Sequence, residues 1–316
     1  MKNFLKFTLY FQSCVCYNKR VKTPSALYKK NGEKSMSYLF LRYPGFKEKA
    51  VSLSYDDCVE ADKKMIALLK RYGVKGTFNL NSGLFDSNGR HLTEEEVRAL
   101  YIPNGMEINV HGEKHVTLFE FQPAMVVNEI FNDRRALEKI AGKPIRGMAY
   151  ANNARGWEKL TPILKNCGID YARATGCTRQ FNLPSNWMHI EPTCSDLTAD
   201  FLELTQKFLD AKMPEYYWDR TPLWFFVYGH ARFTYERHKE DGLEKFCQMV
   251  GNRDDIWFAT VGEMYRYCQA YDRLEFSTDG TCVYNPSAID VYLDYYEEKY
   301  TIPAGETVQL QIKDFP

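Results

Sequence analysis

The chain has 316 residues, of which 45% are hydrophobic and 26% charged, as is typical of a soluble globular protein. Lysine plus arginine and aspartate plus glutamate both number 41, so the overall charge favours neither nucleic acid nor an anionic membrane as a partner. No apolar run reaches the roughly 18 residues of a membrane-spanning helix. The nine cysteines form no CxxC pair, which indicates free thiols in a reducing compartment rather than a disulfide framework.

Residues 1–40 differ in composition from the rest of the chain. Their first 35 positions carry eight lysines and arginines against one acid, Glu33. A basic start and a short apolar run open the chain, but Gln12 and Ser13 interrupt the run and no clear cleavage site follows. A cytoplasmic location is therefore favoured over secretion. We expect residues 1–40 to form a poorly ordered arm, with a short strand near 38–41.

From Lys49 onward, short apolar runs alternate with segments of helical periodicity. Thr93 and Glu96 form a capping box that predicts the start of a helix. About seven strand–helix units in succession predict a mostly parallel sheet, closed as a barrel or doubly wound, with ligands at the carboxyl ends of its strands. The expected strands are 50–55, 75–80, 106–110, 145–150, 170–174, 224–228 and 256–260. The expected helices are 59–72, 93–100, 125–141, 157–166, 197–209, 243–250 and 261–270.

The pattern changes after Asp272. Turn signals such as Asp279-Gly280 and Asn285-Pro286 separate short β-rich segments, and the region is net acidic by about five. We expect a small all-β appendage at 273–316, with strands near 282–284, 289–293, 299–302 and 307–312. It is either a module that binds carbohydrate or a partner, or a structural extension that covers a face of the main domain at 41–272.

Several polar residues follow the predicted strands directly. The first strand ends on two carboxylates, Asp56 and Asp57; His111 and His115 follow the third strand, and His230 follows a later one. One carboxylate and two imidazoles can hold a catalytic divalent metal and leave positions open for water and substrate. Residues four apart share a face of a helix, so a helix would allow both imidazoles to bind together. The second carboxylate would then stand beside the metal, free to move protons.

These residues resemble the motifs of the polysaccharide deacetylase family, which has the NodB homology domain and includes carbohydrate esterase family 4. The family's aromatic-Asp-Asp motif corresponds to Tyr55-Asp56-Asp57, and its His-Ser/Thr-x-x-His motif to His111–His115, with Gly112 in place of the hydroxyl residue. Its last motif, an apolar strand that ends in histidine, corresponds to the segment before His230. The resemblance runs from about residue 45 to 272. It implies a distorted (β/α)7 barrel, here with the small C-terminal all-β appendage.

The resemblance also implies an activity and a role for each residue. Asp57, His111 and His115 would bind one divalent metal ion, Zn²⁺ by preference, with Co²⁺ or Mn²⁺ as alternatives. Asp56 would be the general base that activates the attacking water, and His230 the general acid that protonates the leaving amine. The implied reaction is hydrolysis of acetyl groups on an acetylated glycan, N- or O-linked. A small-molecule amide is the alternative substrate, because the superfamily also cleaves other non-peptide C–N bonds.

The chain departs from the family in its third motif. An Arg-Pro-Pro-Tyr-like loop is reduced to the segment 148–153, which lacks the arginine that braces the base. We expect either that Arg173 supplies this cation from a neighbouring strand end or that it is a plain surface residue. A backbone N–H near Asn152 would serve as oxyanion donor. The family's Asp-Trp motif has no clear equivalent, and Cys58 either narrows the pocket or packs beneath it.

Three aromatic residues are candidates for substrate binding: Tyr150 at a strand end, and Trp187 and Tyr228, which could stack on a sugar ring. The missing arginine also permits a second interpretation, in which the protein is catalytically weakened and only binds a glycan or a partner. Retention of both acids and all three histidines argues against it. A non-haem iron oxygenase, which also uses two histidines and a carboxylate, is disfavoured by the alternating α/β pattern.

Overall fold

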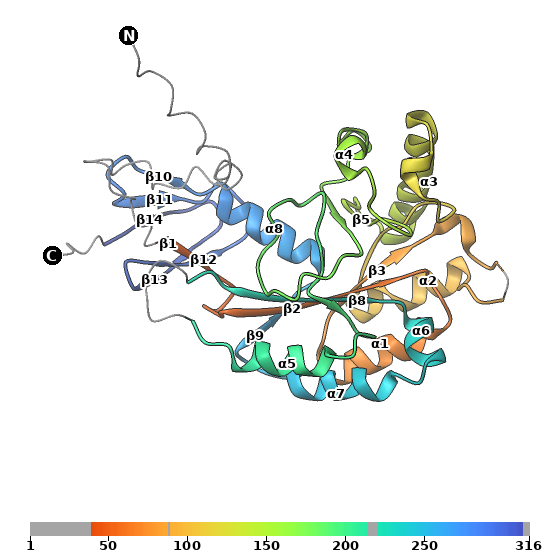
Figure 1. The fold of residues 1–316 in the computed structure, drawn as a ribbon. Helices are drawn as coiled ribbons and strands as arrows, with labels where there is room; N and C mark the ends of the chain where they lie inside the picture. Colours follow the sequence, from red (N-terminus) through yellow and green to blue (C-terminus); the bar gives the residue numbers. More distant parts are fainter. Residues whose placement is uncertain (1–38, 88, 214–219, 312–316) are drawn as a thin grey trace, which may run out of the picture.

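The computed structural model describes residues 39–87, 89–213 and 220–311. Its centre is a curled parallel sheet in which seven strands follow one another in the order β6-β5-β4-β3-β2-β8-β7, while an eighth, β9, pairs with the start of β2 (Figure 1). A bridge between Arg173 and Ile190 joins β6 to the segment that leads into β7. The fold is thus the predicted distorted (β/α)7 barrel. The strands are β2 (Lys49–Asp56), β3 (Gly76–Leu80), β4 (Glu107–Val110), β5 (Gly147–Ala149), β6 (Tyr171–Arg173), β7 (Cys194–Ser195), β8 (Leu223–Gly229) and β9 (Ile256–Phe258).

Helices line both sides of β2 and β8, with α1, α5, α6 and α7 on one side and α3, α4 and α8 on the other (Figure 1). Thr93 and Glu96 make the predicted capping box at the start of α2. None of the helices in the described ranges combines the length and apolarity needed to cross a membrane. The helices are α1 (Ala61–Arg71), α2 (Glu94–Leu100), α3 (Pro123–Ala141), α4 (Trp157–Asn166), α5 (Phe201–Asp210), α6 (Ala231–Glu236), α7 (Glu240–Val250) and α8 (Val261–Asp272).

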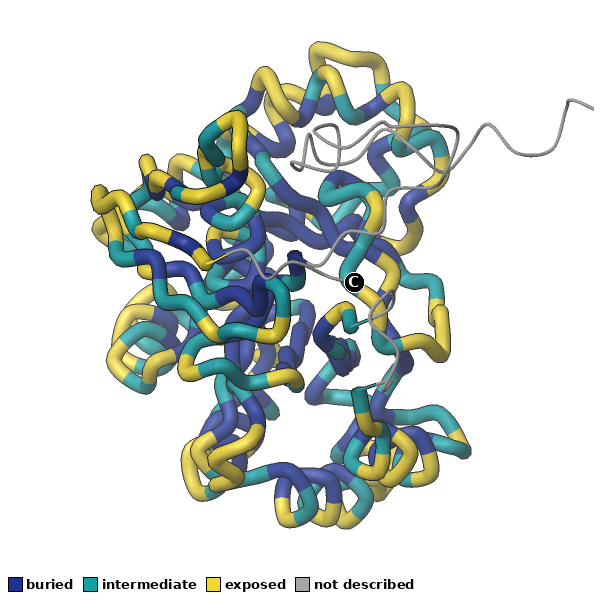
Figure 2. Tube along the Cα trace, turned by 90° about the vertical axis from the view of Figure 1, so that its left-hand side faces the viewer, coloured by how far each residue is buried: buried dark blue, intermediate teal, exposed yellow. Residues whose placement is uncertain are grey.

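The pleat of β2 separates an apolar face from a polar one. Val51, Leu53 and Tyr55 pack into the main hydrophobic core with residues of α1, α5 and α7. Alternate residues point to the opposite face of the sheet, where Ser52 accepts a hydrogen bond from the Trp224 indole at 2.9 Å. Both faces are covered, and the central strands are buried throughout (Figure 2). Asp56, the last residue of the polar face, is therefore buried at the carboxyl end of the sheet.

The C-terminal strands form the predicted β appendage as two three-stranded antiparallel sheets, β1-β12-β13 and β10-β11-β14. The first of them includes β1 (Leu39–Arg42), which the sequence suggested as a strand at the end of the N-terminal arm. Arg42, which is buried, forms a 3.1 Å ion pair with Asp294 of β12. The rest of the predicted arm lies outside the described residues, and the domain boundaries stay a prediction. The other strands are β10 (Glu275–Phe276), β11 (Cys282–Tyr284), β12 (Val291–Tyr295), β13 (Glu298–Ile302) and β14 (Thr307–Gln309).

Candidate active site and metal centre

Asp56 ends β2 inside the barrel and is almost completely buried. Its Oδ1 accepts a hydrogen bond from Asn79 Nδ2 at 2.8 Å, and Arg173 Nη2 lies 2.5 Å from both carboxylate oxygens. Burial alone would raise the pKa of Asp56. The positive charge of Arg173, followed by His111 and His230, outweighs burial and lowers this pKa to about 2. Asp56 is therefore ionised at neutral pH and able to accept a proton.

Arg173 is the last residue of β6, separated from β2 by the three strands β5, β4 and β3 of the sheet. The curl of the sheet brings its guanidinium across to Asp56, and the side chain is buried. The ring of Tyr228 lies 5.2 Å from Arg173 Cζ, a cation–π contact, and its hydroxyl donates to the Thr175 carbonyl at 3.1 Å. Arg173 therefore lies beside Asp56, the position for which the sequence lacks the arginine of the family's third motif. Tyr228 packs against the guanidinium of Arg173.

Asp57 leaves the strand direction of Asp56 because the backbone turns into the left-handed region. Its φ is +86° and that of Cys58 is +57°, a conformation that costs non-glycine residues about 1–2 kcal/mol each. The Tyr101 hydroxyl donates its proton to Asp62 at 2.6 Å, and Asp62 in turn accepts from the Val59 N–H. Cys58 is buried, with its sulfur 3.6 Å from the same Tyr101 hydroxyl. Cys58 therefore packs beneath the acid pair, the second of its two predicted positions.

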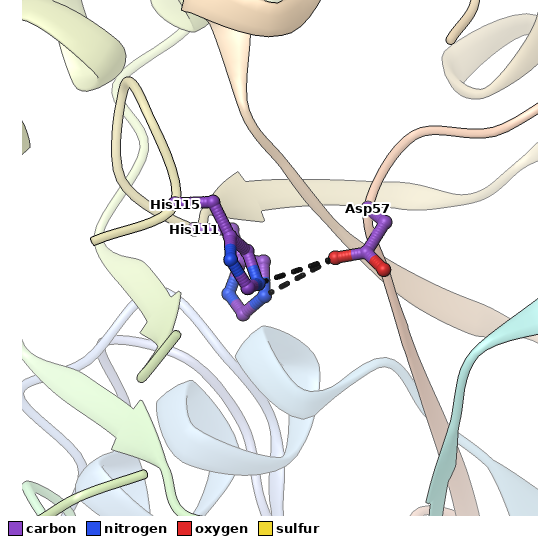
Figure 3. A group of neighbouring side chains, drawn as sticks. All are labelled: Asp57, His111 and His115. Atoms are coloured by element: carbon purple, nitrogen blue, oxygen red, sulfur yellow. Dashed lines mark ion pairs between the residues drawn. The ribbon is translucent and has the colours of Figure 1, made fainter. Parts of the chain in front are cut away.

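The turn directs Asp57 toward both imidazoles (Figure 3). Asp57 Oδ1 lies 3.4 Å from His115 Nε2 and 3.7 Å from His111 Nε2, and the three ligand atoms are all within 4.8 Å of one another. His111 Nδ1 is 3.0 Å from the Ala149 carbonyl, which assigns the proton to Nδ1 and leaves Nε2 as an acceptor. The Asp57 oxygen and His111 Nε2 thus face each other as two acceptors with no proton between them.

The donor set fits a divalent cation. Asp57 Oδ1 and His111 Nε2 are buried atoms that have no hydrogen-bond partner among the described residues. Buried polar atoms normally find partners, and leaving one unpaired costs about 1–3 kcal/mol. A cation between these atoms would satisfy both at once, and one carboxylate with two imidazoles is a common ligand set for zinc and related metals.

Residues 111–115 do not form the helix that would have placed His111 and His115 on one face. His111 follows β4 and His115 lies in an irregular loop, with φ values of +86° at Gly112 and +59° at His115. The imidazole rings approach each other at 4.9 Å with an interplanar angle of 69°. The left-handed residues fold the loop back, so the histidines converge without helical spacing.

His230 approaches Asp56 and Asp57 from the end of β8, as the residue that precedes α6. Its Nε2 lies 3.8 Å from Asp56 Oδ2 and 3.9 Å from Asp57 Oδ2, and 26% of its side chain is exposed. It is thus an accessible member of the cluster. A proton held on His230 can reach a molecule bound at the carboxyl ends of the strands.

Asp196 is a buried acid that the sequence analysis missed. It follows β7, and its Oδ2 accepts hydrogen bonds from Thr234 at 2.6 Å and Tyr55 at 3.2 Å. Burial raises the pKa of Asp196, while these hydrogen bonds and the charge of His230 lower it in part. Thr234 lies one helical turn after His230, so Asp196 fixes the start of α6. Little in the sequence indicated Asp196, because the strand before it, β7, has two residues and is too short to show the alternation of a strand.

Residues 44–172 match the family model described as "Polysaccharide deacetylase". Residues 44–172 thus form a polysaccharide deacetylase domain. The family's enzyme class is that of hydrolases acting on carbon–nitrogen bonds other than peptide bonds. No curated protein sequence matches the chain.

Solved structures of polysaccharide deacetylases and related esterases are similar to this chain. A putative polysaccharide deacetylase from Mycobacterium smegmatis is 20% identical with a TM-score of 0.50, and the match covers 73% of this chain and 93% of that one. A family 4 carbohydrate esterase from Streptomyces lividans, in complex with acetate, is 12% identical with a TM-score of 0.47, and 69% and 95% are covered. A Streptococcus pyogenes deacetylase in complex with acetate is 19% identical with a TM-score of 0.40; the match covers 44% of this chain and 61% of that one.

Two of the aromatic residues predicted to bind substrate, Tyr150 and Trp187, make packing contacts with other side chains and backbone. Tyr150 is buried, and its hydroxyl donates to the Met188 carbonyl at 3.0 Å. Trp187 packs edge-on against Tyr265 at 5.2 Å in a cluster that includes Ala50, at the opposite end of β2 from Asp56. Tyr150 is thus directed into the core and Trp187 is partly buried against its neighbours, and a substrate-binding role stays a prediction for both residues.

Asn152 lies beside the loop from His111 to His115, with its side chain exposed. Its Nδ2 donates to Thr117 Oγ1 at 3.1 Å and lies 3.5 Å from the His115 carbonyl. Its φ of +63° places it in a turn after β5. Asn152 therefore ties the β5 loop to the loop of His115, and its role as an oxyanion donor stays a prediction.

Proposed function

We propose that the protein is a metal-dependent deacetylase that hydrolyses acetyl groups on N- or O-acetylated carbohydrate. One observation carries the proposal: Asp57, His111 and His115 converge directly beside the ionised Asp56, and two of their buried acceptor atoms find no partner in the part of the chain that the structure describes. We further propose Zn²⁺ as the metal held by these three residues, with Co²⁺ or Mn²⁺ as substitutes. Cytoplasmic location likewise stays an inference from the sequence.

The bound metal would lower the pKa of water and polarise the acetyl carbonyl. The chain supplies the proton transfers. Asp56, kept ionised by Arg173, accepts a proton from the attacking water as the new C–O bond forms. His230, on the accessible side, donates a proton to the leaving nitrogen as the C–N bond breaks, so acetate and the amine are released. The 3.8 Å between Asp56 Oδ2 and His230 Nε2 lets the two groups act on one tetrahedral centre.

The interpretation as a weakened binding protein depended on the missing arginine. Arg173 Nη2 lies 2.5 Å from Asp56 Oδ2, so the missing arginine of the third motif no longer favours that interpretation. The second candidate function is hydrolysis of a small-molecule amide. It is favoured because Tyr150 and Trp187 pack against other parts of the protein, so their rings are not presented for stacking on the sugar units of an extended glycan.

Metal analysis combined with an acetate-release assay tests the proposal. Wild-type protein should hold one equivalent of metal and release acetate from at least one member of a panel of N- and O-acetylated oligosaccharides and small acetamides. Asp57→Asn should lose the metal. Asp56→Asn should retain it while turnover falls by about 10²–10⁴-fold, the usual effect of removing a general base. A wild-type protein that binds no metal would refute the proposal, and activity on acetamides alone would favour the second candidate.

A further inference from the structure

The loop from His111 to His115 has a shape that needs support from outside. It is not helical, and it includes the left-handed residues Gly112 and His115. Histidine adopts that conformation at a cost of about 1–2 kcal/mol. Such a backbone persists only where its surroundings hold it.

Asp133, on α3, holds the first residue of this loop. It is fully buried, and its two oxygens are both used: Oδ1 accepts from the Ser82 N–H at 2.8 Å, and Oδ2 from the His111 N–H at 3.1 Å. The His111 N–H is shared with the Leu80 carbonyl at 3.0 Å. Ser82 follows β3 and His111 follows β4. One carboxylate therefore joins two neighbouring strand ends at the base of the proposed metal site.

Glu129 holds the other end of the loop from the preceding turn of α3. Its Oε1 accepts from the Lys114 N–H at 2.6 Å, and its backbone carbonyl accepts from the Glu113 N–H at 3.2 Å. The same Oε1 would lie only 3.0 Å from a Cβ atom on Gly112. The Glu129 carboxylate thus occupies the space beside Gly112, the position where the family motif has serine or threonine.

We propose that Asp133 and Glu129 are positioning residues that set the separation of His111 and His115 and thereby the affinity for the metal. The inference rests on the proposed function, because it assumes that the two imidazoles bind a cation. The two acids lie one helical turn apart on a 19-residue helix, so they form one rigid support for both ends of the loop. Groups that orient metal ligands typically contribute 10–100-fold to metal affinity.

The hydrogen bonds predict different tolerances for the two acids. Asp133 accepts backbone N–H groups on both oxygens, so Asp133→Asn would turn an NH₂ group against one of them; we expect Zn²⁺ affinity to fall by about 10–100-fold. Within the described residues, Glu129 accepts a side-chain hydrogen bond through Oε1 alone, and the carbonyl oxygen of a glutamine can take that place. Glu129→Gln should therefore stay within about threefold of wild type, whereas Glu129→Ala should lose about tenfold or more.

The experiment measures Zn²⁺ dissociation constants by chelator competition on the full chain, starting from metal-free protein. Asn128→Ala, at an exposed position of the same helix, is the matched control and should bind like wild type. Amide exchange at Lys114, followed by NMR without metal, should become faster in Glu129→Ala and stay slow in Glu129→Gln. If Asp133→Asn does not fold, the two Glu129 variants still decide the question.

Weaker Zn²⁺ binding in Glu129→Ala with near wild-type binding in Glu129→Gln supports the inference. Tight binding by wild type and by Glu129→Ala alike overturns it and leaves the proposed function standing. A wild type that binds no Zn²⁺, Co²⁺ or Mn²⁺ overturns both.

Discussion

Replacing Arg173 by methionine would leave Asp56 as a buried carboxylate without its guanidinium partner. In the folded protein the positive charge of Arg173 outweighs burial and lowers the pKa of Asp56 from 3.8 to about 2, which is worth roughly 2–3 kcal/mol of stability at neutral pH. Because the folded-state pKa lies below the unfolded value, this stability is present above pH 4 and is lost as the pH falls toward 2. This free energy is the amount by which the attraction between Asp56 and its positively charged neighbours exceeds the cost of burying the carboxylate.

Without Arg173, burial becomes the dominant influence and the pKa of Asp56 rises. The total loss for Arg173→Met at pH 7 is then about 3–5 kcal/mol, as for other buried ion pairs that lose one partner. The sign of the pH dependence also reverses. Protonation of Asp56 relieves the unpaired charge, so the deficit relative to wild type should shrink as the pH falls from 7 to 5.

A double-mutant cycle measures this coupling. Urea unfolding of wild type, Arg173→Met, Asp56→Asn and the double variant, all in the presence of a chelator, gives the interaction free energy of the pair. We expect a coupling of about 2 kcal/mol or more, because the amide introduced by Asp56→Asn carries no charge for Arg173 to neutralise. The reasoning is refuted if Arg173→Met destabilises both backgrounds equally and to the same extent at pH 7 and pH 5.

Two further substitutions separate chemistry from packing. His230→Gln should slow acetate release from an amide by about 10²–10⁴-fold, but much less from an aryl ester, because a phenolate leaves without protonation; equal losses on both substrates would contradict its role as the acid. Trp187→Ala should lower the free energy of unfolding by about 3 kcal/mol and leave KM unchanged, because the indole packs on Tyr265 and Trp224. A raised KM with unaltered stability would instead support the prediction that Trp187 binds substrate.

The helices and strands of the parallel core could be predicted because hydrophobic periodicity and capping residues are encoded within each segment. The helix expected at 157–166 has the same bounds in α4, and the capping box at Thr93 begins α2 as expected. The features that were missed are short or depend on distant contacts. β7 has two residues and α6 has six, too few to show a period. The pairing of β1 with β12 joins segments about 250 residues apart, which no local pattern encodes.

The candidate metal ligands could be proposed from sequence for a physical reason. Parallel strands bring their carboxyl ends to one edge, so polar residues that directly follow strands meet there whatever lies between them. Side-chain direction is harder to infer. Tyr150 also follows a strand, yet its ring turns inward and its hydroxyl bonds to the Met188 carbonyl, because a loop 38 residues later covers it.

The different positions of Asp56 and Asp57 arise from the backbone, because their side chains are chemically identical. Asp56 still follows the pleat of β2, so it points into the barrel toward Asn79 and Arg173. Asp57 has a φ of +86°, which takes its carboxylate out of that alternation and toward His111 and His115. A regular strand would have sent the second carboxylate to the apolar face that Tyr55 shares with the helices. The strained turn thus lets adjacent residues serve as proton acceptor and metal ligand in the proposed mechanism, and the buried contacts of Cys58 and Asp62 hold that turn in place.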